Sequence, residues 1–171
     1  AARHIDLSLA GLSNYCFRKL GKIDVCFHQA ANNDTLDDDE ENMNFSNVIA
    51  PSHFLSDLIR YSECRKIVYA SSSAVYGSAA APFVEGETPE VPLNAYGRSK
   101  AAFDDWVGQL CLNNPYLSVV GLRYTNVYGT GEEHKGRRAS MIYQIAKTMI
   151  RGESPKLFKD GSQLRDWIYV K

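Results

Sequence analysis

Three short apolar segments, separated by long stretches of helical pattern, constrain the fold of this chain most strongly. The segments are rich in β-branched and aromatic residues and span residues 23–27, 66–70 and 118–124. Apolar residues recur at helical spacing between them, over residues 40–61 and 96–112. Alternating strands and helices with apolar strands are typical of a parallel sheet with helices on both faces. The sequence therefore predicts an α/β, doubly wound fold, in which Pro51 kinks the first helix or begins its firmest part.

The pattern changes after Gly129, where a polar loop, a helix over residues 139–151 and extended pieces at 156–158 and 167–170 are expected. We interpret residues 1–130 as a partial dinucleotide-binding domain and residues 131–171 as the start of a substrate-binding region. Sheets that bind dinucleotides carry a glycine-rich turn after their first strand. No expected strand here leads into one, and the sequence around Gly129 and Gly131 lacks the third glycine. We therefore expect a fragment that lacks the N-terminal glycine-rich βαβ unit.

Composition excludes several classes of function. The formal net charge is −1, so we expect no binding to nucleic acid or to an anionic membrane. No run approaches the roughly 20 apolar residues that span a bilayer, and the first residues lack the pattern of a signal peptide. The four cysteines contain no CxxC pair, which favours reduced thiols in the cytoplasm. The four histidines show no metal-ligand spacing, so we predict no metal site.

Polar residues follow each of the three predicted strands, at residues 30–33, 71–73 and 124–126. Because the carboxyl ends of parallel strands meet at one edge of a sheet, this edge is the expected ligand site. Tyr96 and Lys100 are four residues apart, so both side chains project from one face of the following helix. A tyrosine with a pKa of about 10 transfers protons near neutrality once that pKa falls toward 7, a shift of roughly 4 kcal/mol. A neighbouring lysine ammonium and a positive nicotinamide ring would supply this shift by stabilising phenolate. With a serine hydroxyl to fix the reacting oxygen, these residues form a centre suited to oxidising an alcohol.

Several motifs in this order resemble one enzyme family. They are Phe-His-Gln-Ala-Ala at 27–31, Asn47, Tyr-Ala-Ser-Ser-Ser-Ala-Val-Tyr-Gly at 69–77, Pro-Leu-Asn-Ala-Tyr-Gly-Arg-Ser-Lys at 92–100, Arg-Tyr-Thr-Asn-Val-Tyr-Gly at 123–129 and Arg-Asp at 165–166. The chain is similar to the extended short-chain dehydrogenase/reductases that act on nucleotide sugars. The resemblance implies a Rossmann-like fold, NAD or NADP as cofactor, a nucleotide-diphosphate sugar as substrate, and catalysis by Ser72, Tyr96 and Lys100.

The resemblance also implies the residues of the two binding sites. The cofactor-binding residues would be Ala30, Ala31, Asn47, Ala70, Ser71, Tyr96, Lys100 and Val127. The substrate-binding residues would be Thr35, Ser72, Ser73, Asn126, Phe158 and Arg165. We also expect a homo-oligomer, of a size that the sequence does not determine.

The family's motifs discriminate between reactions. Its 4,6-dehydratases carry an Asp-Glu pair after the catalytic serine or threonine, where this chain has Ser73 and Ala74, so the resemblance implies an epimerase. Residues 126–129, 133–136 and 152–158 resemble the ADP-heptose 6-epimerases, in which the lysine matching Lys135 is a second acid/base residue. Arg137 and Gln144 depart from that pattern, where those enzymes have a serine and a histidine, and the loop at 158–165 is one residue shorter.

Two alternatives remain open at this point. In a UDP-hexose 4-epimerase, Tyr96 alone would perform both proton transfers. A non-catalytic domain that binds NAD(P) or a sugar nucleotide would retain the fold without needing all three catalytic residues.

Overall fold

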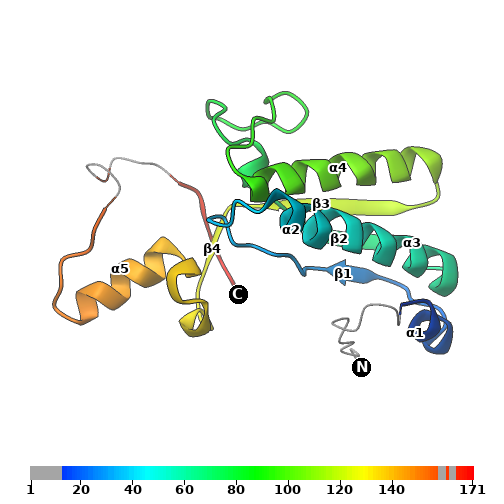
Figure 1. Cartoon of the computed structure of the whole chain (residues 1–171), viewed down its shortest axis with the longest axis horizontal. Helices are drawn as coiled ribbons and strands as arrows, with labels where there is room; N and C mark the ends of the chain where they lie inside the picture. The colour runs from blue at the N-terminus through cyan, green and yellow to red at the C-terminus, as the bar shows by residue number, and fades with distance from the viewer. Residues whose placement is uncertain (1–12, 158–160, 162–164) are drawn as a thin grey trace. The chain divides into compact units, whose positions relative to one another are not determined.

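The computed structural model describes residues 13–157, 161 and 165–171, so Phe158 lies outside the described residues. The chain consists of two compact units, Ala1–Arg123 and Tyr124–Lys171 (Figure 1). The division lies before the predicted boundary after residue 130. The assignment of the two units to cofactor and substrate binding remains a prediction.

A three-stranded sheet forms the centre of the first unit. Its strands are β1 (Cys26–His28), β2 (Lys66–Ser72) and β3 (Ser118–Tyr124), in the order β1-β2-β3. β1 and β2 are parallel, with Cys26 opposite Ile67 and His28 opposite Tyr69. The predicted α/β fold is confirmed, although β1 begins later than expected and β2 continues through Ser71 and Ser72.

Four helices accompany this sheet. They are α1 (Ser13–Leu20), α2 (Glu40–Asn44), α3 (Ala50–Ser62) and α4 (Ala95–Asn113), and a π-helical turn at Phe45–Ile49 joins α2 to α3. Pro51 lies in the first turn of α3, directly after the π-helical turn. The expected helix over residues 40–61 is therefore present, with Pro51 at the start of its regular part. Sequence reasoning missed α1.

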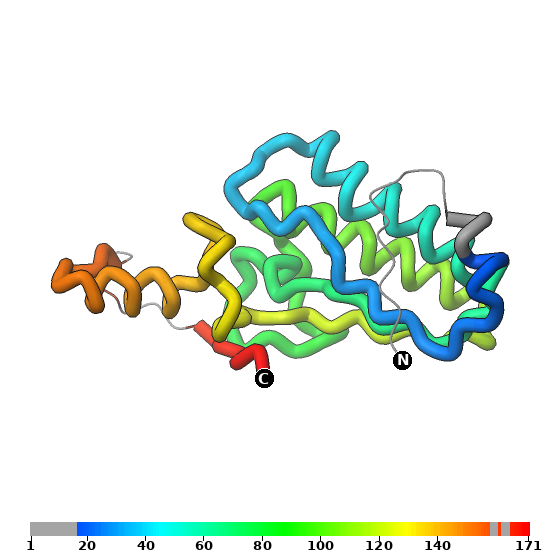
Figure 2. The backbone as a smooth tube through the Cα atoms, turned by 90° about the horizontal axis from the view of Figure 1, so that it is seen from below, coloured from blue at the N-terminus to red at the C-terminus, as the bar shows by residue number. Residues whose placement is uncertain are grey.

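The hydrophobic core lies between the helices and one face of the sheet. Ile67 and Tyr69 on β2 pack in one buried cluster with Leu55, Leu58 and Phe103. Figure 2 shows α3 and α4 on the same side of the strands. Right-handed crossovers between strands that follow one another in the order β1-β2-β3 place both helices on that side. The described strands thus form one half of the predicted doubly wound pattern, with no reversal of strand order among them.

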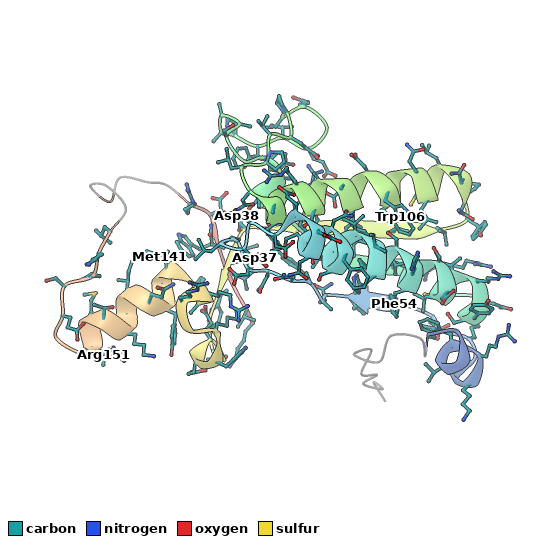
Figure 3. The ribbon with its side chains drawn as sticks, in the orientation of Figure 1. Asp37, Asp38, Phe54, Trp106, Met141 and Arg151 are labelled. Carbon is teal, nitrogen blue, oxygen red and sulfur yellow. The ribbon has the colours of Figure 1, made fainter. Side chains whose placement is uncertain are left out.

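The apolar segment at residues 23–27 predicts a buried strand, and this prediction was wrong. Phe27 on β1 is 71% exposed, and Val120 and Leu122 on β3 are also exposed. Side chains alternate between the two faces of a strand, so only every second residue of β1 faces the helices. Aromatic contacts on the helical side include Phe54 with Phe17, whose ring centroids are 5.3 Å apart; Phe54 is labelled in Figure 3.

The described residues of the second unit form a parallel pair of short strands and one regular helix. The strands are β4 (Asn126–Tyr128) and β5 (Trp167–Tyr169). The expected polar loop contains a 3-10 helix at Glu133–Arg138, and α5 (Met141–Ile150) forms where a helix was predicted, with Ser140 as its N-cap. Met141 and the C-cap Arg151 mark the two ends of α5 in Figure 3.

Neither a membrane segment nor a metal cluster occurs in the part of the chain that the structure describes. Within residues 13–157, 161 and 165–171, every helix is too short or too polar to cross a bilayer. The same ranges hold no group of three or more His, Cys, Asp or Glu side chains arranged to bind a metal ion.

Candidate active site

Ser72 is the last residue of β2 and begins the turn that follows the strand. Its backbone is extended, and its Oγ accepts a 3.2 Å hydrogen bond from the backbone N–H of Ala74, which caps the 3-10 helix Ser73–Val75. The side chain is largely buried. Ser72 therefore lies at the carboxyl end of a central strand, where the sequence predicted a ligand site.

Tyr96 lies in the first turn of α4, and the cap of that helix fixes its position. Asn94 accepts a 2.8 Å hydrogen bond at Oδ1 from the N–H of Gly97, and its Nδ2 donates to the carbonyl oxygen of Thr35 at 3.2 Å. A Cβ at Gly97 would lie 2.8 Å from the carbonyl oxygen of Ala74. Only glycine therefore lets the start of α4 approach the turn after Ser72 this closely.

Ser72, Tyr96 and Lys100 come together at this point. Lys100 Nζ donates a 2.9 Å hydrogen bond to the carbonyl oxygen of Ala70, and it lies 5.8 Å from the centroid of the Tyr96 ring. Hydrogen bonding between the side chains of Ser72 and Tyr96 lowers the pKa of the tyrosine. The structure thus assembles the three residues that the sequence singled out, although their catalytic role remains a prediction.

Burial controls the ionisation of this group. It raises the pKa of Tyr96 by more than the hydrogen bond to Ser72 lowers it. Burial also lowers the pKa of Lys100 to about 8, against an opposing effect of the Asp104 carboxylate. Lys100 by itself therefore does not bring the tyrosine pKa toward 7, and the expectation that the ammonium and the positive nicotinamide ring lower it together stays a prediction. Additional positive charge beside the phenol is required for that shift.

Sequence reasoning missed Asp104, which lies one helical turn after Lys100. Its carboxylate accepts hydrogen bonds from Tyr69 Oη at 2.8 Å, from Ser71 Oγ at 2.8 Å, and from Arg123 Nε and Nη2 at 3.2 and 3.1 Å. The only sequence signal was the spacing of four residues from Lys100, which places both side chains on one helix face. Ser71, a predicted cofactor-binding residue, donates its hydroxyl to this carboxylate, and its role toward a cofactor stays a prediction.

Asn47 binds the loop after β1 to α4. It is 2% exposed; its Oδ1 accepts from Asn32 N at 2.8 Å, and its Nδ2 donates to Asn32 O at 2.9 Å and to Ser99 Oγ at 3.0 Å. Ser99 Oγ in turn donates to the carbonyl oxygen of Tyr96 at 2.8 Å. Asn47 therefore holds protein groups in place with its amide. Ala30 and Ala31, in the loop after β1, are exposed, and their role toward a cofactor stays a prediction.

Three predicted site residues lie near or on the strands of the second unit. Val127 pairs with Ile168 across β4 and β5, Asn126 Nδ2 donates to the carbonyl oxygen of Asp166 at 3.0 Å, and Arg165 is exposed just before β5. Their roles in binding cofactor or substrate remain predictions.

The partly exposed Lys135 lies in the 3-10 helix, which Glu132 supports. Glu132 is buried and accepts hydrogen bonds from Gly129 N at 3.0 Å and from Ser140 Oγ at 2.9 Å. These bonds and the nearby charge of Lys135 outweigh burial and lower the pKa of Glu132. The segment that carries Lys135 is thus held at both ends by one carboxylate.

Solved structures with this fold include several nucleotide-sugar epimerases. The ADP-L-glycero-D-manno-heptose-6-epimerase of Helicobacter pylori is 39% identical with a TM-score of 0.80, over 93% of this chain and 48% of that one. The UDP-N-acetylglucosamine 4-epimerase of Methanobrevibacter ruminantium M1 is 28% identical with a TM-score of 0.80, over 90% and 50%. The UDP-glucuronic acid 4-epimerase of Bacillus cereus, solved in complex with NAD, is 26% identical with a TM-score of 0.75, over 90% and 47%.

The chain therefore spans about half the length of these solved relatives. Residues 4–171 also match the family model described as the NAD dependent epimerase/dehydratase family. The match covers nearly the whole chain, and it agrees with the arrangement of Ser72, Tyr96 and Lys100 described above. This protein belongs to the NAD dependent epimerase/dehydratase family.

Proposed function

We propose that the protein is an NAD-dependent nucleotide-sugar epimerase whose catalytic residues are Ser72, Tyr96 and Lys100. One observation supports this most directly. The hydrogen bond from Lys100 Nζ to the carbonyl oxygen of Ala70 joins α4 to the end of β2, so the ammonium, the phenol and the Ser72 hydroxyl lie together. These are the groups that oxidation of a sugar alcohol requires.

The described residues suit a nicotinamide cofactor. When bound, NAD accepts a hydride from a sugar carbon and returns it, and its oxidised ring is positively charged. A positive charge beside the Tyr96 phenol lowers the pKa of the phenol, whereas burial raises that pKa. The exposed Ala30 and Ala31 after β1 and the half-buried Ala70 in β2 present small side chains that leave room for a ligand.

Tyr96, Ser72 and Lys100 each have a defined task in the proposed reaction. The Tyr96 phenolate takes the proton of a sugar hydroxyl while hydride leaves the same carbon, which yields a ketone. The Ser72 hydroxyl donates a hydrogen bond to the reacting oxygen, and the Lys100 ammonium stabilises the phenolate. Bound NAD would supply the hydride that returns to the opposite face of the carbonyl carbon, while Tyr96 returns the proton to the oxygen, so the net redox change is zero.

Lys135 is the residue that bears on the choice of substrate. We propose that it is a second acid/base group and that the substrate is an ADP-heptose, epimerised at carbon 6. The 39% identity to the Helicobacter pylori ADP-heptose 6-epimerase supports this, as does the support that Glu132 gives to the segment carrying Lys135. Relatives that epimerise UDP-sugars at carbon 4 favour the alternative, in which Tyr96 acts alone.

Turnover of defined nucleotide sugars by the purified full-length protein tests the proposal. The ADP-heptose and UDP-hexoses would each be supplied, and epimer formation followed by NMR, with bound NAD measured by absorbance after release. Tyr96→Phe is expected to abolish epimerisation while NAD stays bound. An unaltered protein that converts no nucleotide sugar would identify a binding domain instead, and a Tyr96→Phe variant with full epimerase activity would refute the catalytic role of Tyr96.

Lys135→Ala separates the two epimerase reactions. A second acid/base group predicts that turnover collapses while NAD content and folding are retained. Lys147→Ala is the matched control, because Lys147 is an exposed lysine of the same unit on α5. Near-normal activity of Lys135→Ala toward a UDP-hexose would favour the 4-epimerase reaction.

A further inference from the structure

We propose that Asp104 is a positioning residue of the active site, which holds Ser72 in place through Ser71 and keeps a negative charge beside Lys100. This inference rests on the proposed function, since it concerns the same three residues. Asp104 itself does not contact the reacting atoms; it acts through its neighbours.

The contacts of Asp104 connect three elements of the first unit. Tyr69 and Ser71 reach it from β2, and Arg123 reaches it from β3, while Asp104 itself lies on α4. Its side chain is only 12% exposed. A buried carboxylate with four hydrogen bonds fixes the separation of the elements that it joins.

The end of β2 is tied to α4 at two successive residues. The carbonyl oxygen of Ala70 accepts from Lys100, and the hydroxyl of Ser71 donates to Asp104. Ser72 follows directly, so its position relative to Tyr96 depends on these two attachments. Both attachments come from the helix that carries Tyr96, so Ser72, Tyr96 and Lys100 lie on two elements, β2 and α4, that these bonds join.

The charge of Asp104 is also placed to act on Lys100. It favours the protonated amine, against the burial that disfavours it. His28 on β1 also faces this region; burial and the nearby Lys100 lower its pKa to about 4, so it adds no positive charge near neutral pH. Arg123 balances Asp104 from the other side and pairs as well with Glu90 and with the hydroxyl of Tyr76. The Asp104 carboxylate therefore favours the protonated form of Lys100 beside Tyr96.

Three variants test this inference in the full-length protein. Asp104→Asn removes the charge, Ser71→Ala removes only the hydrogen bond from the Ser71 hydroxyl to Asp104, and Tyr69→Phe removes a bond of equal length to the same carboxylate. A positioning role predicts that Asp104→Asn and Ser71→Ala lower kcat by about 100-fold with KM for the sugar nucleotide nearly unchanged. Tyr69→Phe is expected to keep kcat, because Tyr69 does not adjoin a catalytic residue in the sequence.

The double variant provides a further check. If Asp104 acts through Ser71, combining Asp104→Asn with Ser71→Ala lowers kcat little more than the stronger single change. If the fold-losses in kcat of the two single variants multiply in the double variant, Asp104 and Ser71 act independently. Equal losses of kcat in Tyr69→Phe and Asp104→Asn would reduce Asp104 to a structural role and overturn the proposal.

A titration of Tyr96 gives a readout that requires no substrate. The ultraviolet difference between each protein and its Tyr96→Phe counterpart reports ionisation of this phenol alone. Losing the Ser72 hydrogen bond disfavours phenolate, so Asp104→Asn is expected to titrate Tyr96 at higher pH than the unaltered protein or Tyr69→Phe. An unchanged titration overturns the inference. The expected shift in a protein without epimerase activity would uphold it while refuting the proposed function.

Discussion

Gly97 lies directly against the carbonyl oxygen of Ala74, so closely that a Cβ on residue 97 would be 2.8 Å from that oxygen. The contact joins the first turn of α4 to the turn that follows Ser72. Gly97 also adjoins Tyr96, and its N–H is capped by Asn94. The distance between the serine and the tyrosine is therefore set where the two backbones meet.

Gly97→Ala is expected to move the start of α4 away from Ser72 and to lower kcat by about 100-fold, the effect of a displacement near 1 Å. Steady-state kinetics on the NAD-bound protein measure this. Gly108→Ala is the matched control, because Gly108 lies in the same helix and a Cβ there would have nothing within 4 Å. That control is expected to keep activity and to gain about 0.5–1 kcal/mol in stability. Full activity of Gly97→Ala would show that the close approach is dispensable.

Lys100→Met is expected to stabilise the fold while abolishing catalysis. Burial lowers the pKa of Lys100 from 10.5 to about 8, so the charged amine costs stability near neutral pH. Removing the charge should raise the free energy of unfolding by about 1–3 kcal/mol at pH 7, as measured by chemical denaturation. A less stable Lys100→Met variant would mean that the hydrogen bond to Ala70 outweighs the cost of burial.

The same pKa predicts how stability depends on pH. Between about pH 8 and 10.5, the unfolded state binds a proton at Lys100 that the folded state has lost. This residue's contribution to the free energy of unfolding should therefore rise with pH in that window. The comparison is made between the unaltered protein and Lys100→Met, since the difference of their curves isolates Lys100. A difference that stays constant from pH 7 to 10 would contradict the lowered pKa.

Asn47→Ala should destabilise the loop that follows β1. It leaves the backbone N–H and C=O of Asn32 without their partner and frees Ser99, at a cost of about 2–3 kcal/mol. Equilibrium unfolding in urea measures this, and NAD retention reports whether the loop supports cofactor binding. Asn113→Ala, at the exposed end of α4, is expected to change stability by less than about 0.5 kcal/mol. Equal effects of both changes would remove the special role of Asn47.

Glu132→Gln is expected to weaken the support of the segment that carries Lys135. The carboxylate binds Gly129 and Ser140, and its pKa is lowered, so its contribution is present above its unfolded pKa and is lost as the pH falls through the folded value. The change should cost about 2 kcal/mol at pH 7 and less under acidic conditions. Glu133→Gln, an exposed neighbour, is the control for loss of charge alone. Unfolding followed from pH 3 to 7 tests the trend, and a constant difference would refute it.

The sequence by itself predicted the strands, the long helix and the members of the site. Strand β3 and helix α4 formed within a residue or two of the predicted bounds, because apolar periodicity reflects which side chains a helix or strand can bury. The placement of Tyr96 and Lys100 on one helix face followed from helical geometry alone. Serines at the end of β2 were predicted beside them, since parallel strands deliver their carboxyl ends to one edge.

Only the tertiary structure revealed what holds these residues in place. Asp104 contacts Ser71 and Tyr69, which are 33 and 35 residues away, and no local pattern indicates such partners. In the chain alone the pKa of Tyr96 is raised, because burial depends on every neighbour that excludes water and not on the spacing of Lys100. Residue types and local periodicity thus determined which groups are present, while long-range packing decided how they are oriented, buried and charged.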